Sequence, residues 1–269
     1  MAAASTNPLL EARGLTMRFG GLTALDALDL VVHEHEILGL LGPNGSGKTT
    51  FFNVVTGLCA ASAGQVLLGG AEITRQSPQA VYKAGVTRTF QRSRLSLPLT
   101  VFDNVALGQT QHLNVGLVFN LLQRKALRRQ FEQTVEQVHT LLKTFNPGMA
   151  AKMWLSAGTL SMIDRRRVEV CRALISNPRL VLLDEPSAGM THDETAELMD
   201  DILQVRKRLS PFTVVIIEHE MGVIQRITQR CVVLNYGKKI ADGSYAEITR
   251  HPEVQVAYLG QDQPSEAVT

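Results

Sequence analysis

Short apolar runs punctuate the chain at Ile37–Leu41, Leu180–Leu183, Val214–Ile217 and Cys231–Leu234. Because these runs are continuous rather than alternating with polar residues, they are typical of strands buried on both faces, as in a parallel sheet covered by helices. Polar residues able to do chemistry follow the first three runs at once. Ligands gather at the carboxyl ends of strands in open α/β sheets, so we expect a functional site at these three strand ends.

The segments that flank the core strands have different patterns. Leu9–Val32 predicts short strands with a turn at Gly20-Gly21, which add an antiparallel flank. Leu113–Phe145 is rich in Leu, Gln, Arg and Glu and lacks proline, which predicts a long helix ended by Asn146-Pro147-Gly148. Its apolar stripe, which we interpret as ordinary packing, repeats at helical spacing through Phe131, Val135, Val138, Leu142 and Phe145.

These patterns predict one domain over residues 1–261, with a helical subdomain of about residues 98–176 inserted into it. The polar residues 262–269 are expected to form a frayed tail. The fold class that follows is α/β, with a mainly parallel core sheet, the antiparallel N-terminal flank and the helical insertion. Trp154, like Phe145, is interpreted as a packing residue.

Composition and charge narrow the possible functions. The 269 residues are 45% hydrophobic and 19% charged, which excludes wholesale disorder. The net charge of +2 gives no support to bulk nucleic-acid binding but does not exclude a local basic patch. The three cysteines form no CxxC pair, which favours reduced thiols in the cytosol. Met1–Pro8 lacks the pattern of a signal peptide, and no run approaches the ~20 apolar residues that span a bilayer. We therefore expect a cytosolic chain that can still dock onto a membrane protein.

A phosphate-binding loop is the most specific motif in the sequence. It fits G-x-x-x-x-G-K-[ST] and lies between the strand Ile37–Leu41 and a helix-compatible stretch, Thr50–Leu58. Main-chain N–H groups of such a loop cradle phosphates, while the lysine bridges the β- and γ-phosphates and the Ser/Thr hydroxyl binds Mg²⁺. A chance glycine turn is the alternative, which this context disfavours. The predicted nucleotide-binding residues are Gly42, Pro43, Asn44, Gly45, Ser46, Gly47, Lys48, Thr49 and Thr50.

Two further strand ends carry candidate catalytic groups. Leu180–Leu183 leads into Asp184-Glu185, where Asp184 is predicted to hold Mg²⁺ and Glu185 to polarise the attacking water. Alone, such a pair is usually just solvated, but beside a phosphate loop it fits a Walker B strand. Val214–Ile217 leads into Glu218-His219, and we interpret His219 as a γ-phosphate contact rather than a structural histidine.

Taken in order, these motifs resemble those of the ATP-binding subunits of ABC transporters over nearly the whole chain, and so imply a P-loop NTPase fold that binds ATP with Mg²⁺. The resemblance implies that Phe19 stacks on adenine and that Gln91, which its pattern alone does not single out, senses Mg²⁺ and the membrane partner. It also implies a signature that contacts the ATP of the opposite subunit: Leu160, Ser161, Met162, Ile163 and Asp164. The implied metal ligands are Thr49, Gln91 and Asp184.

Finer features are similar to the branched-chain amino-acid importer ATPases: Arg88-Thr89-Phe90-Gln91, Ile217-Glu218-His219-Glu220-Met221 and the ending Ala257-Tyr258-Leu259-Gly260. This resemblance implies a second ATPase subunit, two transmembrane permease subunits and, indirectly, a periplasmic or extracellular solute-binding protein. It places the chain on the inner face of the cell membrane. Urea or amide importers and lipopolysaccharide exporters share such features and remain alternatives.

The signature departs from the family pattern of LSGGQ or LSYGQ. Ile163 replaces a glycine that lets main-chain N–H groups approach the γ-phosphate, and a β-branched residue there is expected to obstruct them. Asp164 replaces the usual glutamine; an acid ~5 Å from phosphate would cost roughly 3 kcal/mol per pair of unit charges at an effective dielectric constant of ~20. Thr191 also stands where the family has Asp or Asn.

From these changes we hypothesise two unequal ATP sites in a heterodimer, of which the one that relies on Ile163 and Asp164 turns over slowly. The alternative is a neutral change that the backbone absorbs. A non-transport ABC ATPase and a P-loop kinase or GTPase are the competing classes. The first usually carries two fused ATPase units or a long coiled coil, and neither is seen in this sequence. For the second, no N-K-x-D guanine signature appears, and the set of Gln91, Ser161 and His219 has no place in that class.

Overall fold

The computed structural model describes residues 7–91, 94–112, 124–209 and 212–259. The chain divides into two compact units. Unit 1 comprises residues 1–86, 182–185 and 212–269, and unit 2 comprises residues 87–181 and 186–211. Unit 2 is thus inserted into unit 1 along the sequence. The predicted limits of the helical subdomain stay a prediction, and the predicted tail, residues 262–269, lies outside the described residues.

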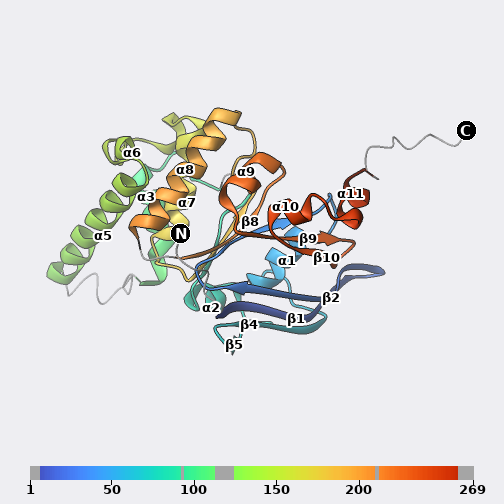
Figure 1. Cartoon of the computed structure of the whole chain (residues 1–269). Coiled ribbons are helices and arrows are strands. Elements are labelled where there is room, and N and C mark those ends of the chain that lie inside the picture. The colour runs from blue at the N-terminus through green and yellow to red at the C-terminus, as the bar shows by residue number, and fades with distance from the viewer. Residues whose placement is uncertain (1–6, 92–93, 113–123, 210–211, 260–269) are drawn as a thin grey trace, which may run out of the picture. The chain divides into compact units, whose positions relative to one another are not determined.

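The strands form two sheets (Figure 1). The six-stranded sheet has the order β10-β9-β3-β8-β7-β6, and the four-stranded sheet has the order β2-β1-β4-β5. Their bounds are β1 Pro8–Phe19, β2 Leu22–His33, β3 Ile37–Leu41, β4 Ala63–Leu68, β5 Ala71–Glu72, β6 Val86–Arg88, β7 Leu180–Asp184, β8 Thr213–Ile217, β9 Arg230–Asn235 and β10 Lys238–Gly243.

The core strands have the predicted character. Every residue of β3, β7 and β8 is buried, which explains why their sequences show no polar alternation. Strand β3 runs parallel to both β8 and β9, and β10 joins the sheet antiparallel to β9. This arrangement confirms the mainly parallel core sheet.

The antiparallel flank is also confirmed, but its strands are longer than predicted. β1 and β2 are 12 residues each and pair around a turn at Gly20, where φ is 58°. Irregularities in their register break the alternation of buried and exposed residues, as between Ala12 and Leu15. Because bulges interrupt the period of two, the sequence pattern looked like shorter pieces. Figure 1 shows β1, β2 and β4 side by side, with α1 (Lys48–Val55) against them.

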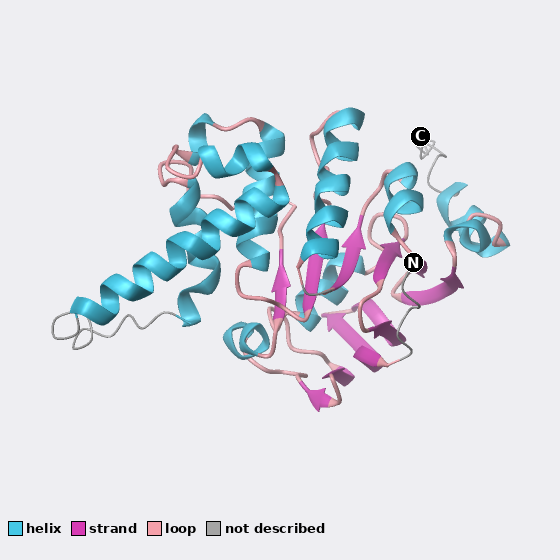
Figure 2. Ribbon diagram, turned by 60° about the vertical axis from the view of Figure 1, so that its left-hand side comes forward, coloured by secondary structure: helices cyan, strands magenta, loops and turns pink. Residues whose placement is uncertain are grey.

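The remaining helices differ in length between the units. Unit 1 carries α1 and four others: α2 Pro78–Lys83, α9 Met221–Ile227, α10 Tyr245–Ile248 and α11 Pro252–Leu259. Unit 2 carries the three longest described helices together with several short ones (Figure 2). They are α3 Val101–Ala106, η1 Leu107–His112, α5 Arg124–Phe145, α6 Pro147–Ala151, η2 Ala157–Thr159, α7 Met162–Leu174 and α8 His192–Arg208. Among the described residues, none of the helices combines the length and the hydropathy needed to cross a membrane.

The predicted long helix corresponds to α5 from residue 124 onward, since residues 113–123 lie outside the described part of the chain. It ends where predicted: the Asn146 side chain accepts a hydrogen bond from Gly148 N at 3.0 Å and caps α6, whose first residue is Pro147. Val138, Leu142 and Phe145 are buried, which confirms that this part of the stripe packs.

Two aromatic residues are less buried than their interpretation as packing residues implies. Phe131 is 52% exposed and Trp154 is 56% exposed. Both still touch the buried Phe102, at ring-centroid distances of 5.6 Å and 4.9 Å. Each of the two rings contacts Phe102 on one side and is exposed to solvent on the other. The prediction for Trp154 was therefore wrong in degree.

Candidate functional site

The phosphate loop connects β3 to α1 within unit 1. Gly42 has φ of 141°, and a Cβ there would lie 2.1 Å from Leu234 O. Gly47, the N-cap of α1, has φ of 107°, and a Cβ there would lie 2.6 Å from Ala24 O. Neither position has room for a side chain, so glycine is required by the packing around the loop. No side chain caps α1, which leaves its first N–H groups suited to phosphate oxygens.

Lys48 lies inside this loop. It is 7% exposed, and its Nζ donates hydrogen bonds to Gly42 O at 2.6 Å and to Pro43 O at 2.9 Å. Burial lowers the pKa of Lys48, and the negative charges of Glu185 and Asp184 partly oppose this effect. The lysine therefore shares one electrostatic environment with Glu185, the predicted catalytic carboxylate, and Asp184, the predicted Mg²⁺ ligand.

The acidic pair is placed by neighbouring strands. Asp184 is the last residue of β7 and is 4% exposed. Glu185 follows with φ of 48°, and its N–H donates to Ile217 O, the last residue of β8, at 2.9 Å. A left-handed φ is costly for a residue other than glycine, and such strain gathers at functional sites. The chain therefore leaves the extended strand conformation at Glu185.

His219 completes the group that the structure brings together in unit 1. Its Nε2 lies 2.8 Å from Glu185 Oε1, and the two side chains are 50% and 19% exposed. The sequence predicted that both residues stand at strand ends but not that they touch each other. Phe19 ends β1 and is 48% exposed, which leaves a free ring face available for stacking.

Tyr258 supports the loop from α11 and was not predicted as a site residue. Its hydroxyl accepts a hydrogen bond from Gly42 N at 2.9 Å. Burial raises the pKa of Tyr258, so the hydroxyl stays neutral at physiological pH. The sequence ending that contains Tyr258 entered only as a family feature, because residues 216 positions apart give no local pattern.

The predicted signature lies in unit 2, at the start of α7. Ser161 is the N-cap of this helix, and its side chain accepts a hydrogen bond from Asp164 N at 3.3 Å. Ser161 and Met162 are exposed, whereas Leu160, Ile163 and Asp164 are buried. The signature therefore presents Ser161 and Met162 to its surroundings, while the side chain of Ile163 packs inside the unit.

The charge of Asp164 is neutralised within unit 2. Its carboxylate oxygens lie 2.5 Å from Lys152 Nζ and 2.9 Å from an Arg167 nitrogen. Burial alone would raise the pKa of Asp164, but the hydrogen bonds and charges of these two cations outweigh it and hold the pKa below its usual value. The expected cost of an acid at this position did not include these two cations, which offset the charge of Asp164. The repulsion between Asp164 and a bound phosphate stays a prediction.

Gln91 and Thr191 also belong to unit 2. Gln91 is exposed, and its main-chain oxygen accepts a hydrogen bond from Arg166 at 2.9 Å. Thr191 caps α8: its Oγ1 accepts from Glu194 N at 3.3 Å, and Glu194 Oε2 accepts from Thr191 N at 3.0 Å. An Asp or Asn in this position would also cap a helix, so the family departure at Thr191 keeps the local structure.

The predicted Mg²⁺ ligands are a hydroxyl, a carboxylate and an amide, all oxygen donors of the kind that Mg²⁺ takes. Asp184 and Thr49 belong to unit 1 and Gln91 to unit 2. Within the described residues, no cluster of three or more His, Cys, Asp or Glu side chains forms a complete metal site. Oxygen donors of these three kinds fit Mg²⁺, which usually keeps further ligand positions for phosphate oxygens and water.

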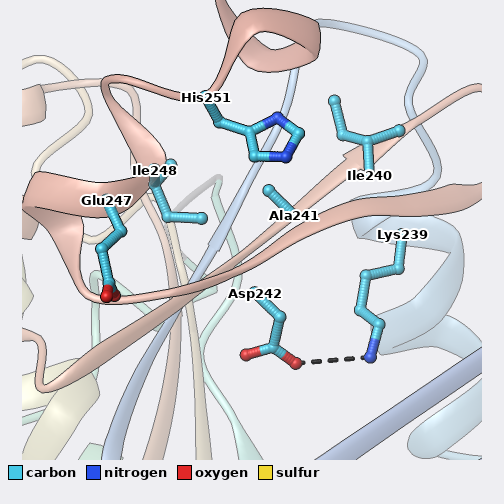
Figure 3. Close-up of a pocket in the computed structure, with 7 residues that line it drawn as sticks. All are labelled: Lys239, Ile240, Ala241, Asp242, Glu247, Ile248 and His251. Atoms are coloured by element: carbon cyan, nitrogen blue, oxygen red, sulfur yellow. Dashed lines mark hydrogen bonds and ion pairs between the residues drawn. The ribbon is translucent and has the colours of Figure 1, made fainter.

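A separate cavity of about 340 Å³ lies beside β10 and α10 in unit 1 (Figure 3). Lys239 Nζ forms an ion pair with Asp242 Oδ2 at 3.3 Å. The Glu247 carboxylate accepts hydrogen bonds from Ser244 N at 2.7 Å and from Ser244 Oγ at 2.8 Å. The charged groups on its wall already have partners within the chain. We therefore place no ligand there.

Comparison with known proteins identifies the family of this chain. The family model described as ABC transporter matches residues 25–188, and the model described as branched-chain amino acid ATP-binding cassette transporter matches residues 238–263. The chain is 38% identical over 256 residues to the high-affinity branched-chain amino acid transport ATP-binding protein BraF of Pseudomonas aeruginosa, and 37% identical over the same length to LivG of Escherichia coli. Both alignments cover 95% of this chain and 99% of the relative.

Solved structures show the same similarity. The ADP conformation of an ATP-binding cassette of an ABC transporter superposes with a TM-score of 0.81 at 27% identity, covering 95% of this chain and all of that one. A nucleotide-free cassette superposes with a TM-score of 0.80, also at 27% identity, over 93% of this chain and 98% of that one. The fold matches in both nucleotide states.

Proposed function

Because this chain belongs to the ABC transporter family and is an ATP-binding, ATP-hydrolysing subunit of such a transporter, we propose that it drives the import of branched-chain or related amino acids. The observation that carries the catalytic part of this proposal is the contact of Glu185 with His219, in the electrostatic environment of Lys48. The substrate part rests on likeness to BraF and LivG, since the transported molecule does not bind to this subunit.

The chain's own residues supply binding and proton handling. The glycine-lined loop and Lys48 hold the phosphates, and Phe19 stacks on the base. Glu185 Oε1 accepts a proton from the attacking water, and His219 Nε2 fixes the orientation of that oxygen over 2.8 Å. Bound Mg²⁺ supplies charge neutralisation for the phosphates, and Thr49, Asp184 and Gln91 are its proposed ligands.

The transporter's permease subunits are the membrane partners of this ATPase. We further propose two such permeases, a second and non-identical ATPase subunit, and a solute-binding protein on the far side of the membrane. The subunit then works from the cytoplasmic face. Each ATP lies between one subunit's phosphate loop and the signature of the other, so neither subunit completes a site alone.

The signature of this chain makes one of the two sites slower in our proposal. Ile163 replaces a residue without a side chain at the second residue of α7 and stiffens the backbone near the phosphate. Asp164 contributes no net repulsion, because Lys152 and Arg167 neutralise it. The asymmetry hypothesis therefore rests on Ile163.

Reconstitution in vesicles tests the proposed function. The full chain is co-purified with its membrane subunits, and ATP hydrolysis is measured with leucine, urea or lipopolysaccharide as the candidate substrate. We expect stimulation by leucine and related amino acids in the presence of the solute-binding protein. Stimulation by urea or by lipopolysaccharide alone would replace the amino-acid assignment, while co-purification with ribosomes or DNA instead of permeases would exclude transport.

A further inference from the structure

Arg166, on α7, makes a set of contacts that the proposed chemistry does not use. Its side chain is 7% exposed, and it pairs with Glu169 Oε2 at 2.8 Å. One terminal nitrogen donates to Gln91 O at 2.9 Å, and Ala188 O lies within 3.3 Å of the same nitrogen. Phe90 O lies 3.4 Å from the other. A single buried guanidinium thus contacts the main-chain oxygens of two consecutive residues, Phe90 and Gln91, and that of Ala188.

Glu169 contacts the chain at Arg94, three residues beyond Gln91. Its Oε1 accepts a hydrogen bond from Arg94 N at 3.0 Å, while its Oε2 holds Arg166. The Glu169 side chain is 3% exposed. The two charged side chains therefore fasten the chain before and after residues 92–93, with Gln91 on the Arg166 side. We call Arg166 and Glu169 the α7 clamp.

The α7 clamp is anchored to the same helix as the signature. Ser161 caps the first turn of α7, and Arg166 lies five residues further along the same helix. At about 1.5 Å per residue this separation is roughly 7.5 Å of continuous, hydrogen-bonded helix. A helix of this length moves as one piece, so a displacement of Ser161 carries Arg166 with it. The third attachment, Ala188, lies in the segment that follows Asp184-Glu185 in the sequence.

The chemistry of the clamp explains why arginine is needed. A guanidinium is planar and always charged, and it presents several N–H donors in a fixed fork. A lysine could keep the ion pair with Glu169 but has only one nitrogen, which cannot contact Gln91, Phe90 and Ala188 together. Buried charge pairs add little net stability but are costly to break, so the pair restricts its surroundings to one arrangement.

We propose that the α7 clamp is a positioning device: Arg166 and Glu169 fix Gln91 and link its position to that of Ser161. This inference rests on the proposed function, because it requires that Gln91 contributes to Mg²⁺ binding. Arg166 acts through Gln91 and touches no substrate. A signature engaged by the opposite subunit's ATP then also sets the position of Gln91.

A double-mutant cycle with the full chain in its purified membrane complex tests the proposal. The variants are Arg166→Gln, Gln91→Ala and the combination, with ATP hydrolysis measured against Mg²⁺ concentration at saturating ATP. We expect Arg166→Gln to lower kcat on the order of 10- to 100-fold, as misplaced catalytic groups do, and to raise the Mg²⁺ concentration for half-maximal rate. In the Gln91→Ala background, the same substitution should change kcat less than about twofold, because coupled residues are not additive.

Two further variants separate positioning from simple stability. Arg166→Lys should keep the melting temperature near that of the parent chain while kcat stays low, since the ion pair survives but the fork does not. Arg167→Gln is the matched control: it removes a buried arginine of the same helix that pairs with Asp164 and Asp201 and has no bond to residues 88–94 among those described. In the double variant of Arg167→Gln and Gln91→Ala, the fold-change in kcat should equal the product of the two single fold-changes, as expected for independent sites.

The outcomes distinguish this inference from the function on which it rests. If Gln91→Ala leaves both kcat and the Mg²⁺ dependence unchanged, the proposed role of Gln91 fails, and the clamp loses its purpose. If Gln91→Ala impairs hydrolysis but Arg166→Gln is silent, or multiplies fully with it, the role of Gln91 stands and the α7 clamp is overturned. Full activity of Arg166→Lys would likewise contradict the need for the fork.

Discussion

His219 Nε2 lies 2.8 Å from Glu185 Oε1, although the two residues are 34 positions apart in the sequence. Each follows a fully buried strand, β8 or β7, and these strands are neighbours in the sheet. In the proposed mechanism, this contact fixes the carboxylate oxygen that accepts the proton of the attacking water. Adjacent strand ends thus bring two residues of separate sequence motifs into contact.

Replacing His219 should impair hydrolysis without weakening nucleotide binding. In His219→Ala the Glu185 carboxylate loses the partner that orients it, and we expect kcat to fall on the order of 100-fold, the lower range for a positioned acid or base. ATP affinity, measured by equilibrium binding, should change little. His139→Ala, on α5, serves as the control. Unchanged kcat in His219→Ala would contradict the orienting role.

The hydrogen bond of Tyr258 to the phosphate loop predicts a distinct effect. Tyr258→Phe leaves Gly42 N without its acceptor, and an unpaired buried donor costs about 1–3 kcal/mol. We expect the KM for ATP to rise roughly 5-fold with a smaller change in kcat. Tyr236→Phe is the matched control, because Tyr236 is 84% exposed. Equal KM values for the two variants would show that α11 does not support the loop.

Restoring glycine at position 163 tests the asymmetry of the two sites. Ile163→Gly removes the β-branched side chain near the helix start, and turnover of the assembled complex should rise severalfold if that residue obstructs the signature. Since Ile163 is buried, the variant will also lose stability, on the order of 2–5 kcal/mol for a large-to-small change, and rates must be compared well below its melting temperature. An unchanged rate per folded complex would show that the backbone absorbs the substitution.

The ion pairs of Asp164 predict how stability depends on pH. The pKa of this carboxyl is lower in the folded chain than in the unfolded chain, so it stabilises the fold above the unfolded value of about 3.9. This stabilisation is lost as the pH falls through the lower, folded-state pKa. Asp164→Asn should therefore reduce the free energy of unfolding by about 2 kcal/mol at pH 7, the contribution of charged hydrogen bonds.

The difference between the Asp164→Asn variant and the parent chain should stay constant from pH 7 to about pH 5 and shrink below that. Denaturant unfolding across this range measures it. A difference that grows as the pH falls would contradict the assignment of a lowered pKa. In the Asp164→Asn variant at neutral pH, Lys152 loses its partner and is released to solvent. Arg167 keeps Glu197 and Asp201 as partners, which limits the loss of stability.

The sequence predicted those parts of the site that lie within one continuous segment. The phosphate loop could be recognised because the strand, the glycines and Lys48 follow one another, and buried runs identified the core strands. Side-chain partners could not be predicted in the same way. The ion pairs of Asp164 with Lys152 and Arg167 depend on the folded chain, so no pattern in the sequence predicted them.

Contacts between residues far apart in the sequence could not be predicted from hydrophobic periodicity either. Tyr258 reaches Gly42 across almost the whole chain, and Arg166 reaches Gln91 over 75 residues. Trp154 was judged by residue type alone, and its exposure depends on which face of Phe102 it covers. Periodicity reports which face of an element is buried, but not which partner covers it.

The central claim is that the loop around Lys48 binds ATP and that Glu185 is required to cleave it. The most direct measurement is ATP binding and phosphate release by the purified complex, compared between the parent chain and Glu185→Gln. We predict that Glu185→Gln retains nucleotide binding and loses hydrolysis by about 10²–10⁴-fold, the range for a general base. Full hydrolysis in this variant, or a parent chain that does not bind MgATP even with its partner subunits, would contradict the account.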